Sequence, residues 1–230
     1  MTFSLIARCP MSEAFGVVIS SSSPCVASRC AWARANVGAV ASQNVTDPRL
    51  GVLGLDLLGQ GFGAQATLER LVEAGAYPEY RQLAVIDNDG GLAHHSGAKT
   101  LGLHRAVTGE ACIAAGNILA NDAVPEAMVA AYREAPREDF PGRLLAGLEA
   151  GLRAGGEEGD VRSAGVYVVH RHVFPIVDLR VDWHDDPIAE LGRIWQVYKP
   201  QMNDYLTRAL DPTGAPAYGV PGDPGKQDRG

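Results

Sequence analysis

Short runs rich in β-branched and aromatic residues recur along the chain, separated by glycine, proline, serine and asparagine. Such runs predict β-strands. The predicted strands cover residues 2–7, 14–20, 37–43, 83–86, 92–96, 111–116, 164–170 and 173–181. The sequence Asn-Asp-Gly-Gly at residues 88–91 predicts a tight hairpin, because these residue types readily adopt the positive φ angles of hairpin turns. The strand at 37–43 is rich in small residues, which indicates close packing between layers.

Elsewhere apolar residues recur at steps of three and four, which predicts helices. Residues 49–75 contain two such segments with a glycine-rich break between them, and further helices are expected at 124–132 and 140–152. Strands are grouped with strands and helices with helices, so the order does not alternate. This grouping favours antiparallel sheets that carry helices, an α+β layered domain.

The last predicted helix, residues 187–210, carries a heptad-like apolar stripe. The stripe consists of Ile188, Leu191, Trp195, Tyr198, Met202, Tyr205 and Ala209. One interpretation is that it packs on the body of the same chain, since Pro200 interrupts it and three heptads are few. The other is a homodimer contact.

Composition is that of a globular protein, with 46% hydrophobic and 20% charged residues. We expect one domain over residues 1–210. Residues 211–230 are rich in Pro, Gly and Asp without an apolar period, which predicts a disordered tail.

The formal net charge is −7, and no run of Lys or Arg interrupts the chain. A nucleic-acid partner requires a basic surface, so that class is excluded. No apolar stretch approaches the roughly 20 residues that span a bilayer, and the first residues lack the features of a secretory signal. We therefore expect a cytoplasmic protein with no membrane partner.

Four cysteines form no C-x-x-C pair, so free and mostly buried thiols are expected. They are Cys9, Cys25, Cys30 and Cys112. The common nucleotide-binding, zinc-protease and α/β-hydrolase motifs are missing from the sequence. We expect neither a cofactor nor a metal.

The second residue, Thr2, has functional groups suited to nucleophilic catalysis. Methionine is removed efficiently ahead of a small residue, and removal of Met1 places a free α-amine beside the hydroxyl of Thr2. An α-amine has a pKa near 8, so part of it is neutral at pH 7 and can accept a proton. Thr2 is therefore a candidate nucleophile with its own amine as the base.

Four segments together resemble an uncharacterised bacterial family grouped with the N-terminal nucleophile (Ntn) hydrolases. They are residues 2–8 (Thr-Phe-Ser-Leu-Ile-Ala-Arg), 32–43 (Trp-Ala-Arg-Ala-Asn-Val-Gly-Ala-Val-Ala-Ser-Gln), 115–119 (Ala-Gly-Asn-Ile-Leu) and 177–182 (Val-Asp-Leu-Arg-Val-Asp). The similarity spans about residues 1–198, and its motifs are specific only as a set.

The resemblance implies a four-layer αββα sandwich, in which two antiparallel sheets lie between helical layers. It also implies amide hydrolysis through a covalent intermediate, with a small amide, lactam or acylated metabolite as the substrate. The alternative is an Ntn-like fold without hydrolase activity that serves ligand binding or assembly.

Three further residues are candidates for the same site. The oxyanion formed during amide hydrolysis requires hydrogen-bond donors directed at it. The side-chain amides of Asn117 and Gln43, both at strand ends, can supply them. Ser163 resembles a family serine that steadies the amine. For each residue, the other interpretation is a strand-end polar group that satisfies the backbone.

The chain also departs from the family pattern. Members usually carry a basic residue near the position of Ser21 and Ser22, where a cation lowers the pKa of the nucleophile. Here the segment is Ser-Ser-Ser-Ser-Pro-Cys, and Arg29 or Arg34 would have to substitute. A chain that retains Met1 has no free amine on Thr2.

The histidines support a different hypothesis, a histidine-metal hydrolase. His170 and His172 share one face of a strand, so with a third ligand they can hold a metal. Candidate third ligands are His104, His184 or an aspartate, but none of them lies at a spacing typical of metal-ligand motifs. The other interpretation is a set of surface histidines.

Overall fold

The computed structural model describes residues 1–135 and 139–220. This part of the chain divides into two compact units, Met1–Arg193 and the residues from Ile194 onward. The first unit holds every strand of two antiparallel sheets.

The larger sheet has six strands in the order β10-β9-β2-β1-β8-β7, and each neighbouring pair is antiparallel. Its strands are β1 (Thr2–Arg8), β2 (Phe15–Ser21), β7 (Arg105–Gly109), β8 (Cys112–Asn117), β9 (Ser163–Val169) and β10 (Pro175–Val181). The smaller sheet has the order β3-β4-β5-β6. Its strands are β3 (Ala31–Arg34), β4 (Gly38–Asn44), β5 (Arg81–Asp87) and β6 (Leu92–Ser96).

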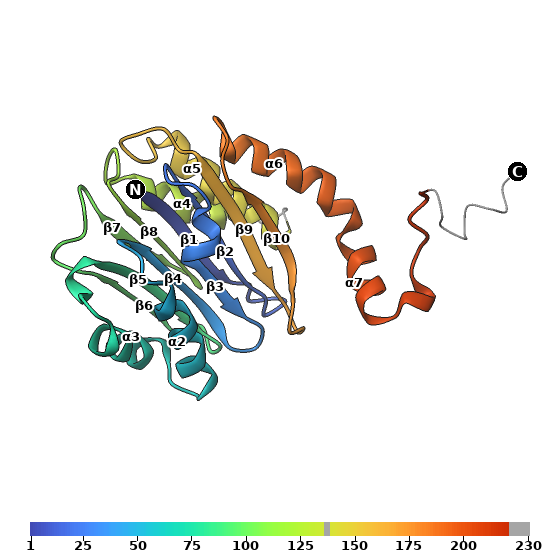
Figure 1. Cartoon of the computed structure of the whole chain (residues 1–230), viewed down its shortest axis with the longest axis horizontal. Helices are drawn as coiled ribbons and strands as arrows, with labels where there is room; N and C mark the ends of the chain where they lie inside the picture. Colours follow the sequence, from blue (N-terminus) through green and yellow to red (C-terminus); the bar gives the residue numbers. More distant parts are fainter. Residues whose placement is uncertain (136–138, 221–230) are drawn as a thin grey trace, which may run out of the picture. The chain divides into compact units, whose positions relative to one another are not determined.

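Helices cover one face of each sheet (Figure 1). Helices α2 (Pro48–Gly59) and α3 (Ala64–Ala74) share an apolar cluster with the four-stranded sheet, which includes Leu55 and Leu71. Helices α4 (Val124–Glu134) and α5 (Phe140–Arg153) pack on the six-stranded sheet. The short helix α1 (Val26–Cys30) lies against β2 and β9.

The other faces of the two sheets pack against each other. Their shared core consists of alternate residues from seven strands. These residues are Ile6, Phe15, Val17, Ala33, Ala39, Ala41, Ala84, Ile86, Ile113 and Val169. The prediction of close packing at 37–43 is confirmed, because Ala39 and Ala41 are almost completely buried in this layer.

Every strand predicted from the sequence is present, with ends that differ by no more than about two residues. Two strands were not predicted, β3 and β7. Both are short strands at a sheet edge with mixed burial, so they lack the long run of β-branched and aromatic residues that identifies the buried central strands.

The helix predicted over 187–210 is divided into two. Helix α6 (Pro187–Tyr198) is followed by a 3₁₀ turn (Lys199–Gln201) and then by α7 (Met202–Leu210). Pro200 lies in the turn, where it cannot donate the hydrogen bond that a continuous helix requires. In the second unit the rings of Tyr198 and Tyr205 stack, with centroids 5.7 Å apart.

Of the predicted tail, residues 221–230 lie outside the described residues. Residues Pro212–Gly214 form a further 3₁₀ turn, and the guanidinium of Arg208 lies 3.8 Å from the ring centroid of Tyr218. The four cysteines are free thiols, and all except Cys25 are buried, as predicted. Among the described residues, no helix combines the length and apolar character needed to cross a membrane.

Candidate functional site

The layer between the two sheets is apolar along most of its length and polar at one end. Toward that end, the inward side chains of four strands become hydroxyls and amides. They are Thr2, Ser4, Gln43, Gln82 and Asn117, each no more than 4% exposed. The neighbouring inward residues on the same strands are Ile6, Ala41, Ala84 and Ala115.

The amides at this end join the sheets through hydrogen bonds. The hydroxyl of Ser4 donates to Oε1 of Gln43 over 2.7 Å, and Nε2 of Gln43 donates to Oε1 of Gln82 over 2.8 Å. Nδ2 of Asn117 donates to the same Gln82 oxygen over 3.1 Å. Because the network is buried, it fixes the orientation of each amide.

Three of the four predicted site residues lie in or beside one row across the six-stranded sheet. Asn117 is the register partner of Thr2, and Ser163 is the register partner of Ser21. The pairing of β1 with β2 places Ser21 next to Thr2. Facing side chains in such a row lie about 5 Å apart. Gln43 lies on the opposite sheet and is connected to Asn117 of this row through Gln82.

The carbonyl oxygen of Met1 is the acceptor for two hydroxyls, those of Thr2 and Ser21. The Ser21 hydroxyl lies 2.9 Å from that of Ser23, which accepts a hydrogen bond from Nη2 of Arg29 over 3.1 Å. A chain of donors therefore runs from the Arg29 cation to the Met1–Thr2 peptide. Sequence reasoning did not identify Ser21 or Ser23 as individual participants.

The structure separates the two arginines proposed to replace the missing basic residue. Arg34 donates to Asp56 over 2.8 Å and to the carbonyl of Leu55, both on α2. Arg29 is the cation linked to the candidate site. It reaches the site through hydroxyls rather than by direct contact.

The Ser163 hydroxyl is engaged with the loop that follows β2. It donates to the carbonyl of Ser23 over 2.6 Å and accepts from the backbone N–H of Val26 over 3.1 Å. These bonds hold the loop that carries Ser23 and follows Ser21. Steadying of the amine by Ser163 stays a prediction.

Three buried acceptor atoms at this end have no hydrogen-bond partner among the described residues. They are Oδ1 of Asn117 and both carboxylate oxygens of Glu157. Asn117 is fully buried and Glu157 is 5% exposed. Unsatisfied buried polar groups are rare in native proteins, and they are often found where a ligand or a reaction uses them.

Backbone contacts bring Glu157 to the site. It forms a bridge with Leu119, two residues beyond β8. The glycines on either side of Glu157 lie close to the first residues of the chain. A Cβ atom placed on Gly156 would be 3.5 Å from the Phe3 ring, and one placed on Gly159 would be 3.7 Å from Met1 Sδ. Burial raises the pKa of the Glu157 carboxyl to about 7, against the opposing effects of the N-terminal charge and of Ser22.

The sequence contained no signal for Glu157. It lies in a glycine-rich loop, Gly-Gly-Glu-Glu-Gly, with no apolar period, and such a segment is typical of an exposed turn. Only the long-range contact with the end of β8 buries its side chain.

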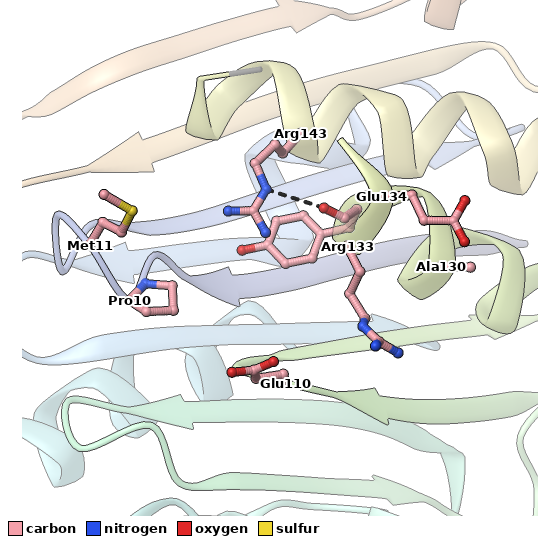
Figure 2. Close-up of a pocket in the computed structure, with 8 residues that line it drawn as sticks. Pro10, Met11, Glu110, Ala130, Arg133, Glu134 and Arg143 are labelled. Carbon is pink, nitrogen blue, oxygen red and sulfur yellow. Dashed lines mark hydrogen bonds between the residues drawn. The ribbon is translucent and has the colours of Figure 1, made fainter. Parts of the chain in front are cut away.

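A cavity of about 510 Å³ lies at the other end of β1, beyond Arg8. Figure 2 shows Arg133, Glu134 and Arg143 around it, with Pro10 and Met11 of the β1–β2 loop at one side. Nε of Arg143 donates to the carbonyl of Tyr132 over 3.2 Å. None of the predicted site residues lines this cavity.

Among the described residues, no group of three His, Cys, Asp or Glu side chains is placed to hold a metal. His170 lies at the end of β9, and the backbone N–H of His172 donates to its carbonyl. The histidine-metal hypothesis therefore gains no support from the described part of the chain.

Two antiparallel sheets with associated helices define a mixed α+β protein. Within that class, the model of the "Family of unknown function (DUF1028)" matches residues 2–191, and the chain belongs to this family. The prediction of an uncharacterised family is thereby confirmed. The relation of that family to the Ntn hydrolases stays a proposal.

Among solved structures, the chain is similar to a DUF1028 protein from Silicibacter pomeroyi. The two are 32% identical, with a TM-score of 0.79 over 86% of this chain and 89% of that chain. A second similarity is to Anbu (ancestral beta-subunit) from Yersinia bercovieri. It is 10% identical with a TM-score of 0.35 over 88% of this chain and 97% of that chain, which is too low to indicate a shared fold. Comparison with curated proteins produces no match.

Proposed function

We propose that this chain is an Ntn-type amidohydrolase, with Thr2 as the nucleophile and a small amide, lactam or acylated metabolite as the substrate. Two facing antiparallel sheets with helices against them support the αββα sandwich on which this chemistry depends. The proposal depends most on one observation: the Met1–Thr2 peptide lies at the polar end of the inter-sheet layer, where two hydroxyls converge on its carbonyl oxygen.

Removal of Met1 makes the Thr2 nitrogen a free amine. The amine accepts the proton of the Thr2 hydroxyl, and Oγ1 then bonds to the substrate carbonyl carbon. The substrate C–N bond breaks, the ammonium returns its proton to the leaving amine, and an ester to Thr2 remains. Water hydrolyses that ester and regenerates the enzyme. Thr2 is held rigidly because it begins a buried strand paired on both sides.

Donors for the developing oxyanion are available beside Thr2. The Ser21 hydroxyl, which donates to the Met1 carbonyl in this structure, becomes free when Met1 leaves. The side-chain amides of Asn117 and Gln43 each use one N–H on Gln82, so each retains a second N–H. Preorganised donors of this kind contribute roughly 100- to 1,000-fold each to an acyl-transfer rate.

Arg29 is proposed to serve where family members carry a basic residue. Its guanidinium donates to Ser23 Oγ, and Ser23 can donate to Ser21 Oγ. Hydrogen bonds that start from a charged donor are stronger than neutral ones. The cation therefore strengthens the Ser21 hydroxyl as a donor without touching the substrate.

Intact mass spectrometry, before and after treatment with a β-lactone probe, tests the proposal. We expect a mass lacking Met1 and one adduct, mapped to Thr2. Thr2→Ala should lose the adduct while its thermal unfolding is almost unchanged, and Thr2→Ser should retain it. An adduct on Thr2→Ala would refute the nucleophile assignment.

A second candidate function is a ligand-binding or assembly module with the same fold. The observation that favours it is the burial of Thr2, 4% exposed, behind a residue 1 whose carbonyl occupies the site. A natural N-terminus that retains Met1 would leave the fold without its base. The mass measurement distinguishes the two functions.

A further inference from the structure

The Glu157 carboxyl lies beside the N-terminus with no hydrogen-bond partner among the described residues. Gly159, two residues further, lies against the Met1 side chain, and the N-terminal ammonium acts electrostatically on the carboxyl. Ser22 is the other group near it: its hydroxyl and backbone N–H lower the pKa of the carboxyl, but neither lies in the geometry of a hydrogen bond to it. Among the described residues, the polar groups that act on the Glu157 carboxyl are therefore one cation and one neutral residue.

A second acceptor without a partner lies on the strand next to Thr2. Oδ1 of Asn117 is buried and unpartnered, and Asn117 is the register partner of Thr2. A primary ammonium has three N–H groups to donate, and it binds best where several acceptors converge. Glu157 and Asn117 together supply more acceptors than the described chain uses.

We propose that Glu157 is a positioning residue that binds the α-amine of Thr2 once Met1 has been removed, with Asn117 Oδ1 as a second acceptor. The inference rests on the proposed function and assigns the group that holds its base. When the amine takes the Thr2 hydroxyl proton it becomes an ammonium. A nearby carboxylate stabilises that charge and aims the nitrogen at Oγ1 until the proton passes to the leaving amine.

This role explains why a carboxyl stays buried without a partner. Burial of an unpaired carboxyl destabilises the fold, so its retention indicates a ligand rather than packing. In the present chain the ammonium is on Met1. Loss of that residue moves the ammonium one residue along β1, to Thr2, the register partner of Asn117.

The test compares processed wild-type protein with Glu157→Gln, which keeps the shape of the side chain and removes its charge. The pKa of the Thr2 amine is measured from the pH dependence of its NMR signal. We expect it to fall by at least about half a unit in the variant, because a neighbouring carboxylate favours the ammonium. Glu158→Gln, at an exposed neighbour, should leave it unchanged.

The acylation rate provides a second readout. In Glu157→Gln the rising limb of the pH–rate profile should move to lower pH, because the pKa of the amine is lower. The plateau rate should fall by about 10-fold, somewhat less than the typical effect of general acid–base catalysis. Glu157→Asp keeps the charge and should restore the position of the limb. An amine pKa that is equal in the wild type and Glu157→Gln would overturn the inference. An unlabelled Thr2 in the processed wild type would refute the proposed function, and the amine pKa would still decide the role of Glu157.

Discussion

Glu157 and Asn117 destabilise the fold that contains them, since each buries an acceptor without a partner among the described residues. An unsatisfied buried polar group costs about 1–3 kcal/mol, and a charged one costs more. Most other amides at this end of the inter-sheet layer are satisfied, those of Gln43 and Gln82 included. Within this end of the layer, the unsatisfied acceptors are those of Asn117 and Glu157.

Glu157→Gln should raise the free energy of unfolding in a pH-dependent way. The folded pKa of about 7 lies above the carboxyl's ordinary value of 4.5, so the folded state holds the extra proton between these values. Wild-type stability therefore falls as pH rises from 4.5 to about 7, and then levels off. The upper limit of this loss is roughly 3 kcal/mol.

Urea unfolding at pH 5 and pH 8 measures the effect. The variant should gain little at pH 5 and most of its advantage at pH 8. Glu158→Gln, whose side chain is exposed, is the matched control and should show the same small difference at both pH values. An equal effect of Glu157→Gln at both pH values would contradict the prediction.

At the scale of elements, the segment from the end of β2 into α1 connects the cation to the site. Arg29 lies in the last turn of α1 and donates to Ser23, and Ser163 of β9 holds the Ser23 carbonyl. The segment is short and pinned at several points, so it presents the Ser21 hydroxyl in a fixed direction.

Ser23→Ala should break the connection between Arg29 and Ser21 while the Ser21 hydroxyl remains. We expect the acylation rate of Thr2 to fall about 10-fold, less than the roughly 100-fold that loss of a direct oxyanion donor produces. Ser28→Ala is the control, because Ser28 lies on the same helix with its hydroxyl on the carbonyl of Cys25 and away from the site. Equal rates in the two variants would show that the donor chain is irrelevant to acylation.

At the scale of the whole molecule, the assembly state is open to measurement. The apolar stripe of the helical segment 187–210 is buried within the chain at its start, at Ile188 and Leu191, as one of the two interpretations predicts, whereas on α7 Tyr205 is 41% exposed. An exposed aromatic residue on an amphipathic helix is a candidate for burial in a partner. We therefore predict a homodimer formed through this segment.

Light scattering after size exclusion should give a mass twice the 24.3 kDa of one chain. Tyr205→Glu should give the monomer, since a charge in an apolar contact has no counterpart to pair with. Asn203→Glu places the same charge on the same helix at an exposed position off the stripe, and it should leave the dimer intact. A monomeric wild type would rule out this interface.

Local patterns sufficed for most elements of the fold. Runs of β-branched and aromatic residues identified the central strands, and the Asn-Asp-Gly-Gly turn identified the β5–β6 hairpin, since neighbouring residues alone decide these features. The interruption of the last helix at Pro200 follows from one residue. Thr2 could be selected as the candidate nucleophile because an N-terminal nucleophile is defined by its position directly after the removed methionine.

The remaining features of the fold and the site depended on which strand faces pack against each other. The two-residue repeat of a strand shows which of its side chains share a face, but it does not show which other strand that face meets. Strand pairing made Thr2 and Asn117 register partners, and the packing of two sheets brought Gln43 toward Ser4. The choice of Arg29 over Arg34 followed from helix placement. Glu157 became a buried, unpartnered carboxyl through contact with Leu119, 38 residues earlier in the chain. Burial is a property of the assembled fold, so only the tertiary structure could distinguish this glutamate from an exposed one.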